Sequence, residues 1–135
     1  MKIPSIIPYF KVAAGFVLIY SLLWMALEGE LGRDLALATA VALLAAGFAL
    51  TLFLGGQTIS KRQFVILTAV VGLAVGVALP LLTIFLMALK TGIHAHGPEY
   101  TPGEIAWVLR QLPLWAGVGG LSGLGIGLLA AAARH

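Results

Sequence analysis

The sequence predicts an all-α integral membrane protein, with four transmembrane helices in a compact bundle and one short interfacial amphipathic helix between the third and fourth. Hydrophobic residues make up 61% of the 135 positions and charged residues only 10%. The mean hydropathy is +1.07, and so little charge cannot cover a soluble domain of this size. Four long apolar runs alternate with short polar segments, so we treat 1–135 as a single polytopic membrane domain.

The first two spans are expected at residues 12–27 and 35–54. Lys11 precedes the first apolar run and Glu28 follows it. No small-residue cleavage site follows this run, which favours a retained span over a signal peptide. The second span should end at Gly55 and Gly56, a strong helix stop.

The third span is expected at residues 61–89, because Ser60 and Gln63 form a capping-box pattern. Its apolar part is longer than the bilayer core requires, so the helix must tilt, kink or protrude. Pro80 lacks the amide that would bond the carbonyl of Gly76, which makes it the candidate hinge. The alternative is a proline that the membrane helix simply tolerates.

Residues 90–113 form the expected outer loop, and a short helix should begin within it at Pro102. Thr101 and Glu104 form a second capping box around that proline. The apolar side chains that follow have helical spacing and define an interface helix. Its residues are Ile105, Trp107, Val108 and Leu109. Such a helix can lie in the membrane interface, cover the top of the bundle or contact a neighbouring subunit.

The fourth span, expected at residues 114–133, carries a doubled GxxxG pattern that predicts a close helix contact. The third span contains a GxxxG pattern of its own. The predicted helix-packing residues are Gly72, Gly76, Gly119, Gly123 and Gly127. Further glycines make more than one side of the fourth span slim, so a second side could receive a neighbouring protein, a flat pigment or a lipid.

The distribution of charge predicts cytoplasmic termini, in a bacterial inner membrane or an internal membrane. Five basic residues fall on the side of the termini and three on the other side. The five are Lys2, Lys11, Lys61, Arg62 and Arg134. All five acidic residues fall on the opposite side, namely Glu28, Glu30, Asp34, Glu99 and Glu104.

The central part of each expected span lacks ionisable residues, which argues against a proton relay or an ion-coupled pump. The chain has no cysteine, which excludes thiol catalysis and thiolate metal sites. Its basic residues are dispersed, so nucleic acid is not an expected partner. An enzyme is not expected either, because one apolar bundle and one short loop do not assemble a nucleophile, a base and an oxyanion site.

His94 and His96 are the one possible ligand pair, and Glu99 could complete a site for a divalent metal. A solvated loop with two histidines is the alternative. Axial ligation of a haem or a chlorophyll by His94 is a further possibility, without a C-x-x-C-H motif to support it. The sequence therefore identifies no specific cofactor.

The function expected from these features is contact with other helices. The chain should act as a small accessory, stabilising or assembly subunit of a larger membrane complex, with the bilayer and other membrane subunits or itself as partners. A small oligomeric transporter or channel is the first alternative, and a metal- or cofactor-binding membrane protein using His94 and His96 is the second. The interface helix and the two histidines are the expected outer docking surface.

Overall fold

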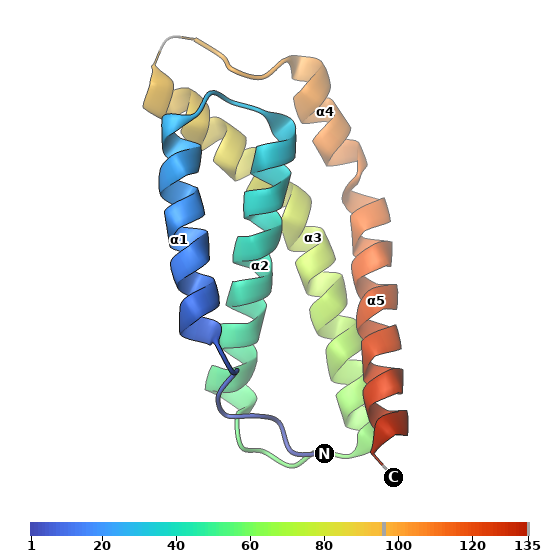
Figure 1. Cartoon of the computed structure of the whole chain (residues 1–135). Helices are drawn as coiled ribbons and strands as arrows, with labels where there is room; N and C mark the ends of the chain where they lie inside the picture. The colour runs from blue at the N-terminus through green and yellow to red at the C-terminus, as the bar shows by residue number, and fades with distance from the viewer. Residues whose placement is uncertain (96, 135) are drawn as a thin grey trace.

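The computed structural model describes residues 1–95 and 97–134, and it is built from five α-helices within those residues. The helices are α1 (Phe10–Ala26), α2 (Leu31–Leu54), α3 (Lys61–His94), α4 (Pro102–Arg110) and α5 (Leu112–Ala133). Successive long helices run in opposite directions, so both termini lie at the same end of the molecule (Figure 1). The α1–α2 turn and the α3–α4 loop lie at the other end.

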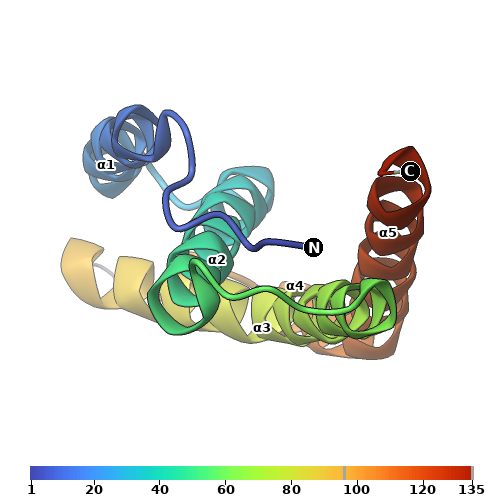
Figure 2. The same cartoon turned by 90° about the horizontal axis from the view of Figure 1, so that it is seen from below.

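The long helices form an open row instead of the expected compact bundle. α3 packs against α2 and, most extensively, against α5, while α1 packs on α2. Seen from below, α1 and α5 lie at opposite ends of the row, and the N-terminal segment runs between α2 and α5 (Figure 2). The row is open because α2 and α5 pack on different faces of α3.

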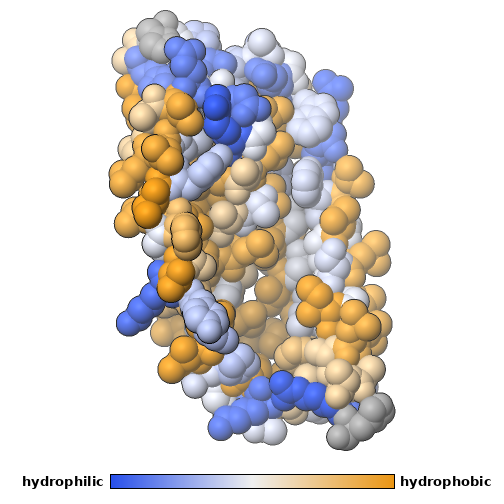
Figure 3. All heavy atoms as spheres, in the orientation of Figure 1, coloured by the Kyte–Doolittle hydropathy of each residue, from blue (hydrophilic) through white to orange (hydrophobic). Residues whose placement is uncertain are grey.

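Three helical stretches are long and apolar enough to cross a membrane, namely α2, α3 and the stretch that contains α4 and α5. α1 is apolar but has only 17 residues. Large apolar side chains lie exposed along the helices, including Phe16 (70% exposed), Phe53 (72%) and Leu121 (71%). Figure 3 shows hydrophobic side chains along the length of the molecule and hydrophilic ones at its two ends, the pattern of a protein whose sides face lipid.

Two helix boundaries differ from the predicted ones by four residues or more, and those of α1 and α5 differ by at most two. α2 begins at Leu31 instead of residue 35, because the Glu30 carboxylate accepts hydrogen bonds from the amides of Gly32 and Arg33. α3 continues past residue 89 to His94 and ends at Ala95, whose φ of 54° is left-handed. Both extensions bring charged residues into helices that the apolar pattern had left outside.

Both predicted capping boxes are present, at Ser60–Gln63 and at Thr101–Glu104. Pro113, the last residue of the expected outer loop, does not interrupt the helical stretch. Gln111 alone separates α4 from α5, and Pro113 lies in the first turn of α5. Amides of the first turn have no acceptor within the helix, so a proline there costs no helical hydrogen bond. α4 therefore continues onto α5 with almost no connecting loop.

The glycines lie where α3 and α5 approach backbone to backbone. A Cβ on Gly72 would collide with the carbonyl of Gly119, and one on Gly123 with the carbonyl of Thr68. Gly76 faces the Trp115 carbonyl in the same way. Gly119 and Gly127 also face α3, against Gly72 and against Thr68 with Val65 respectively. Side chains larger than hydrogen would separate these helices.

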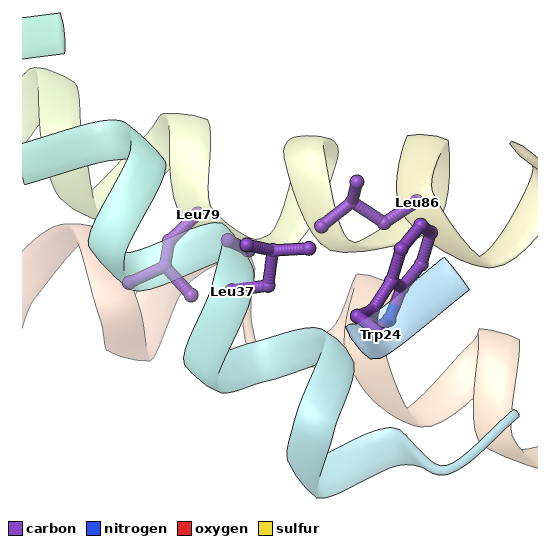
Figure 4. Packing of buried hydrophobic residues seen from close by; sticks show 5 residues of the cluster. Trp24, Leu37, Leu79 and Leu86 are labelled. Carbon is purple, nitrogen blue, oxygen red and sulfur yellow. The ribbon is translucent and has the colours of Figure 1, made fainter. Parts of the chain in front are cut away.

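α3 changes direction in its middle, and its C-terminal half leans toward α1 (Figure 1). Pro80 is buried there, inside the helix. Beyond this bend, the last turns of α3 cross the N-terminal part of α2. The main apolar core lies at this crossing, where Trp24 of α1 and Leu37 of α2 gather with Leu79 and Leu86 of α3 (Figure 4).

Candidate functional site: a buried polar cluster

A cluster of polar side chains lies at the end of the molecule opposite the termini. It joins the end of α1, the start of α2, the end of α3 and the α3–α4 loop. We call it the buried polar cluster, and its members are Trp24, Asp34, Lys90, His94, Glu99 and Tyr100. Asp34 and Lys90 are both fully buried, and Trp24 and Tyr100 are only 3% and 7% exposed.

Trp24 lies between the two buried charges. Its indole Nε1 donates a hydrogen bond of 2.6 Å to the Asp34 carboxylate. The Lys90 ammonium lies 4.4 Å from the centroid of the Trp24 ring and donates to the Trp24 backbone carbonyl. In the described part of the chain Asp34 and Lys90 form no direct ion pair. The opposite charges thus contact the same residue through different groups, Asp34 through the indole N–H and Lys90 through the ring face and the backbone carbonyl.

His94 and Glu99 fasten the loops to one another. Nδ1 of His94 contacts the Glu99 carboxylate, and Nε2 lies 3.1 Å from the backbone carbonyl of Met25. The other Glu99 oxygen accepts from the amide of Gly29. Both ring nitrogens of His94 therefore face oxygen atoms of other segments. These contacts tie the α3–α4 loop to the α1–α2 turn.

Two polar atoms of the cluster are not satisfied. Among the described residues, the Asp34 Oδ2 atom and the Tyr100 hydroxyl are buried and have no hydrogen-bond partner of good geometry. Burial raises the pKa of Tyr100 above its ordinary value, and the neighbouring Asp34 carboxylate raises it further. Tyr100 is therefore a neutral hydroxyl that can act as a donor beside a buried carboxylate.

The predicted metal ligands are brought together only in part. His94 and Glu99 are in contact, whereas His96 lies outside the described residues. Within residues 1–95 and 97–134, no three histidine, aspartate or glutamate side chains converge as a metal site would require. A metal site that uses His96 stays a prediction.

The interface helix packs on its own chain through one residue. Val108 is 1% exposed and lies against Met87 and Tyr100. Ile105, Trp107 and Leu109 remain 38%, 44% and 49% exposed. α4 therefore covers the end of α3 with Val108, so that only the other three side chains are left for an outer docking surface.

The sequence pattern locates the charged residues of the cluster but does not predict that they are buried. Asp34 and Lys90 stand at the ends of apolar runs, where charges ordinarily face water. One feature of the sequence could have predicted that Asp34 and Lys90 lie close together. The start of the second span and the end of the third lie at the same end of an antiparallel pair, so an acid and a base at these two positions are expected to be near each other.

Similarity to known proteins does not assign a role to this cluster. No protein-family model, curated protein or solved structure matches the chain. The geometry itself has the features of a structural element. Its hydrogen bonds connect segments that are distant in sequence.

Replacing Trp24 with phenylalanine should test the bridging role of the indole. The change keeps an aromatic ring near Lys90 but removes the donor to Asp34, so we expect a loss of about 1 to 3 kcal/mol in the free energy of unfolding. Denaturant titration of the purified protein would measure it. Trp107→Phe is the matched control, because Trp107 is 44% exposed and should change stability by less than about 0.5 kcal/mol. Equal effects at the two positions would contradict the bridging role.

Proposed function

We propose that this chain is a four-pass membrane protein that acts through helix contacts, as a small accessory, stabilising or assembly subunit of a larger membrane complex. α1 would cross the membrane in addition to the three longer helical stretches, which gives four spans in all. Its 17 residues have a helical length of about 26 Å, close to the roughly 30 Å of a bilayer core. The first helix would then be the shortest of the four spans.

The observation that carries this proposal is the unpaired outer side of α5. Gly119, Gly123 and Gly127 face α3, but a Cβ added at Gly117 or Gly125 would meet nothing within 4 Å in the described part of the chain. On the side of α5 that faces away from α3, Gly117 and Gly125 thus alternate at four-residue spacing with the exposed Leu121 and Leu129. Glycine positions on a membrane helix favour close approach by another helix. The exposed residues of α4 could extend such a contact beyond the bilayer.

Native co-purification tests the proposal. After extraction with a mild detergent, an accessory subunit should migrate with larger partners that mass spectrometry can identify. Gly117→Leu with Gly125→Leu should release it, because the larger side chains block the outer side of α5 while leaving the α3 contact intact. Leu52→Phe with Leu81→Phe, at exposed positions on α2 and α3, serves as the control. A chain that migrates alone, or a complex unchanged by the glycine pair, would contradict the proposal.

A small transporter formed by oligomerisation is the second candidate, and the buried charges Asp34 and Lys90 favour it. Ionisable groups buried near a membrane often belong to transport pathways. Such a protein should be active when purified alone and reconstituted, and Asp34→Asn should abolish transport. An accessory subunit should have no transport activity of its own.

The orientation can be tested by labelling single cysteines, since the chain has none of its own. We expect Thr58→Cys, in the α2–α3 loop, to react with a membrane-impermeant reagent only from the cytoplasmic side. Gly103→Cys, at the start of α4, should react only from the opposite side. Both positions are exposed, so a failure to react would reflect sidedness and not burial. Reversed labelling would contradict cytoplasmic termini.

A further inference from the structure

An apolar groove opens between α2, α3 and α5, toward the end of the molecule that carries the termini. Its volume is about 450 Å³. Leu50 of α2, Val71 of α3 and Ile126 of α5 are among the side chains that line it. Thr68 also lines the groove, but its hydroxyl bonds the carbonyls of Phe64 and Val65 in its own helix. The walls therefore favour an apolar occupant.

The N-terminal segment crosses the groove and fixes one of its ends. Ile3 is 4% exposed and lines the groove together with Pro4 and Ile7. The amide of Ile3 donates to the carbonyl of Gln57, and the amide of Gly56 donates to Ile3, each over 2.9 Å. Figure 2 shows the segment between α2 and α5. These backbone hydrogen bonds thus hold the N-terminal segment in place as a wall of the groove, at the polar end of the molecule.

Basic residues gather around that same end. Lys2 precedes Ile3 and pairs with Thr58 across an isolated antiparallel bridge. Lys61 begins α3, and its ammonium donates over 2.6 Å to the carbonyl of Arg134, which caps α5. Lys2, Lys61, Arg62 and Arg134 are all exposed. Because the five acidic side chains are all at the other end, the charged side chains beside the groove are basic among the residues that the structure describes.

We propose that this groove binds one acyl chain of an anionic phospholipid, whose phosphate lies among Lys2, Lys61 and Arg62. The inference rests on the membrane location proposed above. An apolar channel that ends beside clustered basic residues complements both parts of such a lipid. The lipid would fill the space that the open row of helices leaves between α2 and α5.

The size of the groove favours an acyl chain over a helix from another protein. Small-molecule sites commonly enclose about 300 to 1,000 Å³, a range that includes the groove's 450 Å³. A spanning helix about 10 Å across and 30 Å long occupies on the order of 2,000 Å³. It would also meet the N-terminal segment, which crosses the groove.

Lipid binding to the intact, detergent-purified chain can be measured by native mass spectrometry. The probes are phosphatidylglycerol and phosphatidylcholine with identical acyl chains, and we expect at least tenfold tighter binding of phosphatidylglycerol. Arg62→Gln should weaken this binding about fivefold, and Lys2→Gln with Arg62→Gln roughly 30-fold. Arg110→Gln removes one positive charge from the opposite end and should leave binding unchanged. Equal affinity for the two lipids would overturn the proposed headgroup site.

Filling the groove tests the acyl-chain site separately. Ser122 lines the groove and is exposed, so Ser122→Phe adds a ring there without removing a packed side chain. We expect it to weaken binding of both lipids at least tenfold. Leu121→Phe is the control, because Leu121 is 71% exposed and lies outside the groove lining. Unchanged binding in Ser122→Phe would overturn the site.

Three results would each overturn the lipid site, and they differ in what they say of the proposed function. A stable dimer that Ser122→Phe dissociates would identify the groove as a contact between copies of the chain. Release of the chain from membranes by alkaline carbonate would overturn the membrane location and the lipid site together. Retention in the membrane with no lipid preference would overturn the lipid site alone.

Discussion

Replacing Gly123 with leucine is expected to separate α5 from α3 and to lower the free energy of unfolding by more than about 3 kcal/mol, the upper end of ordinary overpacking costs. The reason is that a side chain at Gly123 meets the backbone carbonyl of Thr68 and not the flexible end of another side chain. Neither backbone can yield without moving a whole helix. Denaturant titration of the purified chain and its abundance in membranes would measure the loss.

Gly125→Leu is the matched control for this prediction. It lies two residues away on the same helix, and a Cβ there meets nothing within 4 Å in the part of the chain that the structure describes. Both substitutions change helix propensity equally, so the difference between them isolates the α3–α5 contact. If Gly123→Leu were as stable as Gly125→Leu, the backbone contact would be incorrectly described.

Replacing Asp34 with alanine is expected to destabilise the chain by about 3 to 5 kcal/mol, the usual effect of removing one member of a buried charge pair. The substitution leaves the Trp24 indole N–H without its acceptor and removes one of the two carboxylates that act on Lys90, the other being Glu99. Unfolding of the purified protein would show the change. Glu28→Ala removes an exposed acid close by and should have an effect below about 0.5 kcal/mol.

A second variant separates loss of charge balance from loss of packing. Asp34→Asn with Lys90→Met removes both charges while keeping similar volumes, so it should recover a substantial part of the stability lost in Asp34→Ala. If the double variant were less stable than Asp34→Ala, the electrostatic account of the cluster would be wrong.

Local signals predicted most of the helices. The capping residues Ser60 and Thr101 marked two helix starts correctly, because a cap depends on only a few neighbouring residues. The starts and ends that failed involved Glu30 and Lys90, whose charge resembled that of a solvated flank. An apolar run cannot show that a charged residue beyond it belongs to the same helix.

The arrangement of the helices was less predictable. Glycine spacing indicated where α5 could be approached closely, but the same spacing would suit a closed bundle or an open row. The buried polar cluster depends on contacts between Trp24, Asp34 and Lys90, which lie in three different helices. Periodicity within one helix contains no information about such contacts, and only the antiparallel order of the spans brings them near each other.

The buried polar cluster also has a consequence for the order of events during biosynthesis. Asp34 emerges from the ribosome with the α1–α2 hairpin, whereas Lys90 and Tyr100 follow only after all of α2 and most of α3 have been made. The hairpin is therefore made with a carboxylate whose only cluster partner so far is the Trp24 indole. The contacts that join the α1–α2 turn to the α3–α4 loop can form only after that loop has been made. In them Glu99 accepts from the amide of Gly29, and His94 contacts the carbonyl of Met25. A chain stalled before that loop would contain the α1–α2 hairpin without the contacts of Lys90, Glu99 and His94 that complete the cluster.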